Sequence, residues 1–488
     1  MRFISSRGKA NPVSAPEAVL SGIAPDGGLY LPDTLPCLDW QTLPQDYPAL
    51  ATAIFEALLP GFAPDTLRVI SQAAYTGRFD SPQVAPLVPL GDEAYVLELF
   101  HGPTAAFKDL ALSVLPRLMV SARDQLMPGR PILVLTATSG DTGSAAMAGF
   151  QDLPGTRVTV FYPEGGVSPV QRAQMLGLSG GNLAAYAIQG DFDAAQAGVK
   201  AVFAKEGELG FPAGLLLSSA NSINIGRLVP QVAYYFSAYQ SLVHEGAIRA
   251  GEPLHAVVPS GNFGDILAGY LAKRMGLPLG KLVCASNQNR VLTDFLESGR
   301  YDRRRRLHLS VSPSMDILVS SNVERLIYLA SDGASALVSG LMTQLNVQGH
   351  YQLPEDVLAE IKNDFLAVSA TETDTLAAIR QVWEEQRYVL DPHAAVAWHG
   401  YQQLRHQLPG KTLVLATASP FKFPRTVLKA LGEAKAEDGL CGMAALSDKT
   451  EIPIPPALAW LKGTQSAGEP VIDPAAIPQT ALQEANRC

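Results

Sequence analysis

The sequence predicts an α/β fold built on parallel sheets. Strand-like apolar runs alternate with helical patterns along most of the 488 residues, which is typical of parallel strands joined by crossover helices. Several of these runs end in glycine- or serine-rich turns, as a cleft between two α/β lobes requires. The strand-like runs are PILVLTAT (131–138), TRVTVFYP (156–163), LAAYAIQG (183–190), LHAVVPSG (254–261), LVCASN (282–287) and TLVLATAS (412–419).

We expect four regions along the chain. Residues 1–92 form an N-terminal domain, whose end is marked by the proline-containing segment SPQVAPLVPLGDEA. A first α/β lobe follows over 93–250 and a second over 251–455, and segments of the two lobes are allowed to interleave. Residues 456–488 form a C-terminal tail, and the proline- and alanine-rich composition after Ile454 indicates loose structure.

Composition argues against several classes of protein. With 47% hydrophobic residues, the chain can bury a large core. It contains no transmembrane run, and its start, MRFISSRGKANPVS, lacks the apolar core of an export signal, so we expect a cytoplasmic protein with no membrane partner. The net charge of -9 argues against nucleic acid as a partner. Oligomeric state stays open between monomer and homodimer.

The cysteines indicate neither a metal site nor a disulfide framework. Cys37, Cys284, Cys441 and Cys488 have no metal-ligand spacing and no C-x-x-C pair. We therefore expect reduced thiols.

Lys108 is the candidate nucleophile. It lies in HGPTAAFKDLA (101–111), between small or apolar residues at a turn before a helical segment, and the apolar run LALSVLPRLMV overlaps its end. Such surroundings can hold the ammonium group partly desolvated, which lowers its pKa and makes the neutral amine available for a Schiff base. A solvated surface lysine is the alternative for this motif taken alone.

A second motif has the chemistry of a phosphate cradle. In HAVVPSGNFGDILAGYLAKRM (255–275), an apolar strand runs into Ser-Gly-Asn-Phe-Gly-Asp (260–265) and then into a helix. Glycines let successive backbone N–H groups converge on an anion, and the helix adds its positive end. The motif matches neither G-x-G-x-x-G nor the P-loop lysine pattern. Taken alone, a strand-to-helix turn without a ligand remains an equal alternative.

Two further segments place hydroxyls at strand ends. PILVLTATSGDTGSAAMAGF (131–150) presents Ser139, Asp141 and Thr142 with Gly140 and Gly143 at the carboxyl end of a strand, where open α/β sheets bind ligands and a substrate carboxylate would fit. In KTLVLATASPFKFP (411–424), Thr417 ends another strand and can direct its hydroxyl into the same cleft.

Together these motifs resemble the threonine synthase family, a group of pyridoxal-phosphate enzymes of fold type II that is similar to tryptophan synthase β. The resemblance covers nearly the whole chain and implies two α/β lobes around a cofactor cleft plus an N-terminal domain. The segments that carry it are GIAPDGGLYLP (22–32), HGPTAAFKD (101–109), TSGDTG (138–143), SANSINIGRLVPQ (219–231), PSGNFGD (259–265), SPSMDILVSSNVER (312–325) and DPHAAVAWHG (391–400).

The resemblance implies a role for each matching residue. Lys108 would hold pyridoxal 5'-phosphate as a Schiff base, and Thr417 would hydrogen-bond its pyridine nitrogen, which leaves the ring neutral and a weaker electron sink. The residues expected around the cofactor phosphate are Gly261, Asn262, Phe263, Gly264 and Asp265. Those expected at the amino-acid end of the substrate are Ser139, Asp141 and Thr142. Those expected to face the substrate phosphate are Asn221, Ser222 and Arg227.

Some residues depart from the family or invite a second role. The TAHPAKF-like segment of the family has histidine and alanine where this chain has Ser419 and Phe421, although Thr417 and Lys422 remain. Beside Lys108, His101 is expected to have a structural or substrate-contact role. His393, in DPHAAVAW, is expected to be a satisfied histidine at a helix start.

The implied reaction converts O-phospho-L-homoserine and water into L-threonine and phosphate. Phosphate leaves from the γ carbon and water adds at the β carbon, with Lys108 as the positioned base. Two alternatives stay open: a phospholyase that releases phosphate and ends in a 2-oxoacid, and a non-catalytic module that binds the cofactor.

Overall fold

A computed structural model describes residues 1–463 and 468–488 and confirms the α/β fold with parallel sheets. Within these residues the larger sheet has six strands in the order β13-β10-β9-β14-β4-β3, and every neighbouring pair is parallel except β3 and β4. Its strands are β3 (Leu87–Leu90), β4 (Ala94–Glu98), β9 (Leu254–Pro259), β10 (Leu279–Ser286), β13 (Phe365–Ser369) and β14 (Thr412–Ala416).

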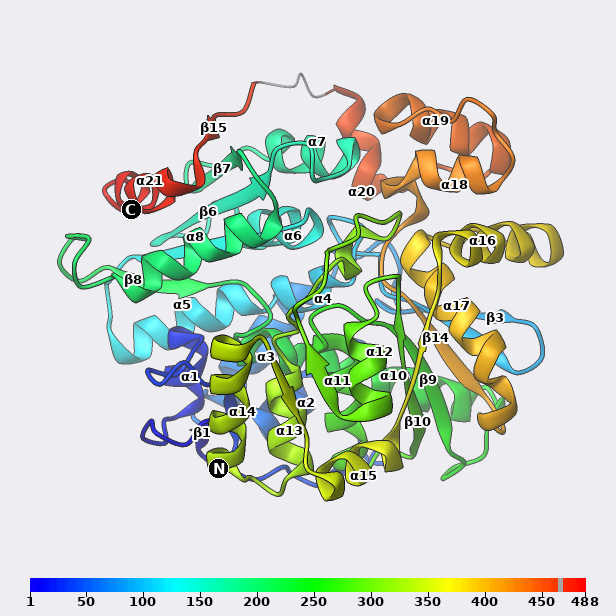
Figure 1. The fold of residues 1–488 in the computed structure, drawn as a ribbon, viewed down its shortest axis with the longest axis horizontal. Helices are drawn as coiled ribbons and strands as arrows, with labels where there is room; N and C mark the ends of the chain where they lie inside the picture. The colour runs from blue at the N-terminus through cyan, green and yellow to red at the C-terminus, as the bar shows by residue number, and fades with distance from the viewer. Residues whose placement is uncertain (464–467) are drawn as a thin grey trace.

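The smaller sheet has five strands among the described residues, all parallel, in the order β15-β7-β6-β5-β8. Figure 1 shows it above the larger sheet, with α8 (Phe192–Ala204) and α21 (Ile477–Ala485) beside it. The strands are β5 (Ile132–Ala137), β6 (Thr156–Pro163), β7 (Leu183–Ile188), β8 (Leu216–Ser219) and β15 (Val471–Ile472).

Apolar residues run continuously along β5 because both faces of the smaller sheet are covered. Leu133 and Leu135 share a core cluster with α8 and α21, whereas Ile132 and Val134 join the cluster that contains α6 (Asp141–Phe150). Successive residues of a strand point to opposite faces, so neither face of this strand meets water. Each of the six strand-like runs seen in the sequence overlaps a strand of one of the two sheets.

The two lobes interleave along the chain. Strands β3 and β4 lie in the larger sheet with strands that begin at Leu254, while β5 to β8 between them form the smaller sheet. The chain therefore crosses between the lobes twice before its last segment returns to the smaller sheet.

The expectation of a loosely structured tail after Ile454 is wrong for its last part. β15 pairs with β7, and α21 buries Ile477, Ala481 and Ala485 against the smaller sheet. These residues recur every four positions and form a helical face that the proline- and alanine-rich composition hides. A buried ion pair between Arg157 and Glu484 ties α21 to β6.

The N-terminal region packs onto this framework rather than on a core of its own. It contains an antiparallel pair, β1 (Phe3–Ser5) and β2 (Tyr30–Pro32), and the helices α1 (Ala15–Ser21), α2 (Tyr47–Leu58) and α3 (Pro64–Tyr75). Its apolar side chains join the same core cluster as those of α5 (Leu115–Leu126) and α10 (Val232–His244).

Further helices connect and cover the strands. Those nearest the cavity described below are α4 (Lys108–Leu112), α7 (Pro169–Gly177), α9 (Ile225–Leu228), α11 (Gly264–Arg274), α17 (Pro392–Leu404) and the short 3₁₀ turns η2 (Pro313–Met315) and η4 (Pro420–Lys422). The others are α12 (Val291–Ser298), α13 (Val323–Ala330), α14 (Ser335–Gln348), α15 (Glu355–Asp364), α16 (Glu372–Gln386), α18 (Pro424–Ala430), α19 (Gly439–Thr450) and α20 (Pro456–Ala459). A two-stranded ribbon joins β11 (Arg300–Asp302) to β12 (His350–Gln352).

No helix in the described part of the chain is long and apolar enough to cross a membrane.

Candidate active site

A cavity opens where the turns that follow four parallel strands meet. The turns come after β5 and β8 of the smaller sheet and after β9 and β14 of the larger one. All the site residues expected from the sequence line this cavity except Ser139. The lining residues are Phe107, Lys108, Asp141, Thr142, Asn221, Ser222, Arg227, Gln231, Pro259, Ser260, Gly261, Asn262, Phe263, Gly264, Asp265, Ile266, Ser314, Met315, His393 and Thr417.

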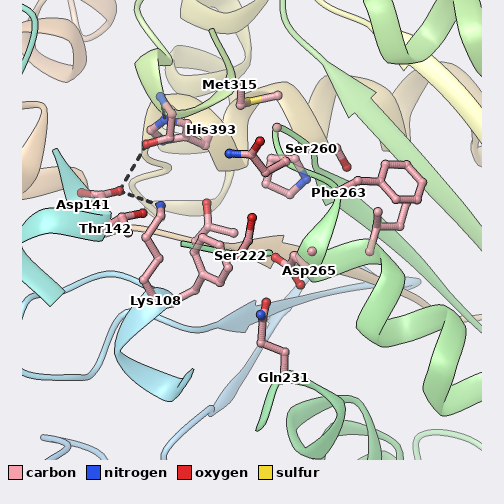
Figure 2. A pocket seen from close by; sticks show the side chains of 18 of the residues that line it. Lys108, Asp141, Thr142, Ser222, Gln231, Ser260, Phe263, Asp265, Met315 and His393 are labelled. Carbon is pink, nitrogen blue, oxygen red and sulfur yellow. Dashed lines mark hydrogen bonds and ion pairs between the residues drawn. The ribbon is translucent and has the colours of Figure 1, made fainter. Parts of the chain in front are cut away.

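Lys108 is held at the first position of α4 by contacts on both sides. Before it, the Phe107 N–H donates to the Thr417 carbonyl at 2.8 Å; after it, Asp109 accepts from the Thr104 N–H and hydroxyl at 2.8 and 2.6 Å. The Lys108 side chain is only 12% exposed, and its Nζ lies 3.4 Å from Asp141 Oδ2 (Figure 2). The backbone contacts therefore fix where the amine enters the cavity.

The environment of Lys108 lowers the pKa of its amine. Burial lowers the pKa of Lys108, the nearby positive charges of Arg227 and Lys422 lower it further, and Asp141 opposes them. The net direction is downward, so a larger share of neutral amine is present at neutral pH than on an exposed lysine.

Asp141 joins the two lobes through its carboxylate. It begins α6, on the smaller sheet, and its Oδ1 lies 2.8 Å from Nζ of Lys422, which ends η4 after β14 of the larger sheet. Gln171 Nε2 donates to the same oxygen at 2.8 Å, and the Ser314 hydroxyl donates to Oδ2 at 3.3 Å. Burial alone would raise the pKa of Asp141, but Lys422 and Lys108 outweigh it and hold that pKa well below its usual range.

The turn from β9 to α11 leaves room for an anion at the start of the helix. Phe263 adopts a left-handed conformation with φ 60°, and a Cβ on Gly261 would lie 2.7 Å from the Ser314 carbonyl oxygen, so only glycine fits there. Asn262 Oδ1 and Asp265 Oδ2 are buried and have no hydrogen-bond partner among the described residues. The positive end of the helix suits a phosphate group, whereas these two oxygens are acceptors that still lack a donor.

A second place for an anion lies across the cavity at Arg227, on α9. The Arg227 side chain is buried, Nη1 donates to the Ala220 carbonyl at 2.8 Å, and Nε has no partner in the described part of the chain. None of the ion pairs among the described residues includes Arg227. Burial lowers the pKa of Arg227 to about 10, so the group stays positive at neutral pH. A buried cation without a carboxylate partner is costly unless an anionic ligand occupies its side of the cavity.

Comparison with known proteins places this chain in a family. Residues 80–419 match the family described as pyridoxal-phosphate dependent enzyme, and residues 2–75 match the one described as threonine synthase N terminus. Threonine synthase of Pseudomonas aeruginosa is 39% identical over 89% of this chain and 92% of its own length. The chain belongs to the threonine synthase family.

Solved structures and other relatives agree with this assignment. A PLP-bound threonine synthase from Brucella melitensis superposes with a TM-score of 0.84, 36% identity and 99% coverage of both chains. The yeast threonine synthase structure gives 0.87 at 32% identity and covers 99% of this chain and 98% of that one. Threonine synthase-like 1 of Macaca fascicularis is 41% identical over 85% of this chain, and the match spans 58% of that longer protein.

The residues quoted for the family resemblance do not all reach the cavity. Ser139 lies in the turn before α6 but not on the cavity wall. The Thr138 hydroxyl accepts from the N–H groups of Gly140 and Gly143, both at 2.9 Å, and Gly140 has φ 128°. This closed turn presents Asp141 and Thr142 to the cavity in place of Ser139.

Eight of the lining residues were not assigned to the site from the sequence: Phe107, Gln231, Pro259, Ser260, Ile266, Ser314, Met315 and His393. His393 does begin a helix and pairs through Nδ1 with Asp391 at 2.7 Å, as expected, but its Nε2 also accepts from the Ser314 N–H at 3.2 Å. His393 and Ser314 each lie in a segment that carries the family resemblance, 391–400 and 312–325, yet no local spacing shows that these two segments meet.

Arg325 is a further residue that the sequence did not single out for the site. It is fully buried; its Nε donates to the Tyr30 carbonyl at 3.0 Å and its Nη2 to the Ile223 carbonyl at 2.6 Å. It therefore ties the N-terminal region to the segment that carries Asn221 and Ser222.

The remaining sequence expectations lie outside the cavity wall. His101 contacts Asp80 at 2.5 Å and Glu98 at 2.8 Å. Ser419 and Phe421, which depart from the family pattern, are buried, Ser419 as the N-cap of η4 and Phe421 within it. None of these residues lines the cavity. No group of His, Cys, Asp and Glu in the described chain has the arrangement of a metal site.

Proposed function

We propose that this protein is a threonine synthase that uses pyridoxal 5'-phosphate to convert O-phospho-L-homoserine and water into L-threonine and phosphate. The observation that carries the proposal is the presence of two separate places for anions around Lys108. The turn before α11 suits the phosphate of the cofactor, and buried Arg227 suits the phosphate of the substrate.

The residues around the cavity can hold the cofactor in one orientation. Lys108 would bind it covalently, Gly261 to Asp265 would surround its phosphate, and Thr417 would meet the ring nitrogen with a neutral hydroxyl. When bound, the cofactor supplies an electron sink for the carbon atoms next to the substrate nitrogen. The positions of Lys108 and Thr417 support this arrangement, because the Phe107 N–H to Thr417 carbonyl bond holds their backbones together.

Lys108 is the group that would move protons. Its lowered pKa makes the amine able to accept a proton from the α carbon, to accept one from the β carbon once the first has been passed on to the bound cofactor, and to return one to the α carbon at the end. Asp141, which stays ionised, would keep the lysine oriented at 3.4 Å and, with Thr142, contact the amino-acid end of the substrate.

Asn221, Ser222 and Arg227 would hold the phosphate before and after it leaves the γ carbon. A guanidinium supported by neutral donors suits a doubly charged phosphate. If the released phosphate stays at Arg227, it can take a proton from the water that adds at the β carbon. Retention of the intermediate is what separates threonine formation from release of a 2-oxoacid.

Replacing Arg227 by alanine is expected to lower kcat/KM for O-phospho-L-homoserine by roughly ten- to a hundred-fold, since one or more charge-assisted hydrogen bonds of about 1.5–3 kcal/mol are lost. Part of the loss should appear in kcat, because the same anion is the leaving group. Inhibition by inorganic phosphate should weaken in parallel, with Arg249→Ala on the surface as the matched control. An unchanged inhibition constant in the folded Arg227→Ala protein would exclude Arg227 from the phosphate site.

Product analysis tests the proposed reaction. The purified protein, loaded with cofactor, is incubated with O-phospho-L-homoserine, and amino acids, 2-oxoacids and phosphate are quantified. We expect one threonine per phosphate released. A 2-oxoacid in place of threonine would identify the phospholyase alternative, and the absence of any product would identify a module that binds the cofactor without turnover.

A further inference from the structure

Asp265 places a carboxyl group in the turn that we assign to the cofactor phosphate. It is the second residue of α11, it is 6% exposed, and it lines the cavity beside Asn262 and Gly264. An ionised carboxylate here would face a phosphate that carries the same sign of charge, so its protonation state decides whether it repels or binds that group.

The two oxygens of Asp265 differ in their surroundings. Oδ1 accepts hydrogen bonds from the hydroxyls of Tyr234 and Tyr235, the latter at 3.2 Å. Oδ2 is buried and has no partner among the described residues. A protonated carboxyl group would satisfy both positions, because Oδ1 would keep its two donors and the Oδ2 hydroxyl would donate to an acceptor in the cavity.

The charged groups near Asp265 permit such a neutral state. Tyr234 and Tyr235 face it from α10, and burial raises the pKa of both hydroxyls well above the usual value, so they donate as neutral groups. Lys108 on α4 and Arg227 on α9 are the cations that line the same cavity. Burial raises the pKa of Asp265 to about 6, although the two tyrosines and Lys108 act in the opposite direction.

We propose that Asp265 binds the cofactor phosphate as a neutral carboxylic acid, with its Oδ2 hydroxyl donating to a phosphate oxygen. The inference rests on the proposed function, because it requires the cofactor phosphate to lie in this turn. Above pH 6 the free site is mainly ionised, so loading the cofactor takes up one proton from solvent at Asp265. The phosphate keeps its own charge and no covalent bond changes at this residue.

Cofactor dissociation constants of the full-length chain, measured by absorbance between pH 6 and 8.5, test this inference. Asp265→Asn is the matched variant, because its amide donates at every pH. We expect the ratio of the wild-type constant to the Asp265→Asn constant to rise about tenfold per pH unit above pH 6, as linkage to one proton requires. The Schiff base and the phosphate titrate in both proteins, so their contributions to the pH dependence cancel in the ratio. A ratio that stays constant with pH would overturn the proposal.

Tyr235→Phe provides a second test that does not depend on the folding of Asp265→Asn. It removes one donor to Oδ1, which should raise the pKa of the free Asp265 and move the start of the pH dependence of cofactor affinity upward. If the pH dependence of cofactor affinity began at the same pH in Tyr235→Phe as in the wild type, the proposal would be contradicted. Failure of the wild-type protein to bind the cofactor through Lys108 would instead remove the proposed function, whereas normal binding with a flat ratio would remove only the role of Asp265.

Discussion

Replacing Lys108 by alanine is expected to lower threonine formation by roughly 10⁴-fold or more, the upper range for loss of a positioned general base. The variant lacks the amine that we propose as covalent anchor and as the group that moves protons at the α and β carbons. It should still retain part of its cofactor, because the turn before α11 and Thr417 remain in place. Turnover is followed by phosphate release and by threonine analysis.

Lys205→Ala serves as the matched control for this substitution, since Lys205 is an exposed lysine outside the cavity. It should behave as the wild type in both assays. Wild-type turnover in Lys108→Ala would contradict the assignment of Lys108 as the catalytic residue.

Replacing Lys422 by methionine is expected to lower the free energy of unfolding by about 3–5 kcal/mol, the usual cost of removing one partner of a buried ion pair. The Lys422 side chain is fully buried, and its Nζ contacts Asp141 Oδ1 and the Thr104 carbonyl, both at 2.8 Å. Methionine fills similar space but leaves the Asp141 carboxylate without its nearer cation. Because the pKa of Asp141 is held below its usual value, the contribution of the pair is fully present above about pH 4 and is lost as the pH falls through the lowered pKa.

Urea unfolding of matched variants measures this effect. Lys429→Met, an exposed position seven residues further along the chain, should change stability by less than about 0.5 kcal/mol. The double variant Lys422→Met with Asp141→Asn should lose less stability than the sum of the two single changes, because Asp141→Asn removes the buried charge that Lys422→Met leaves unpaired. Equal losses from Lys422→Met and Lys429→Met would show that the pair does not hold the lobes together.

The fold could be predicted largely because parallel strands covered on both faces have a clear sequence pattern. β5 is a nearly continuous apolar run, β6 is rich in β-branched and aromatic residues, and each strand is followed by a turn that is local in sequence. Lys108, Asp141, Gly261 and Thr417 could be recognised from the sequence for the same reason, since each lies at or near the end of a strand or the start of a helix. Their common cavity follows from the rule that parallel strands present their carboxyl ends at one edge.

The rest depends on contacts between distant segments, which no local pattern shows. Lys422 and Asp141 come from different lobes, and so do Ser314 and Asp141. Arg325 is charged, so composition suggests an exposed side chain, yet carbonyl groups from two other regions enclose it. The apolar residues Ile477, Ala481 and Ala485, spaced by four, let α21 pack on the sheet, although the same composition also suits an unfolded tail.

Borohydride reduction of the purified, cofactor-loaded protein tests the central claim most directly. Reduction fixes a Schiff base as a stable amine, and peptide mass mapping then identifies the lysine that carries the cofactor. We expect the label on Lys108. Lys422 is an internal comparison, because it is also buried and close to Asp141 but does not line the cavity. A label on Lys422 or on another lysine, or a protein with no reducible cofactor, would contradict the account.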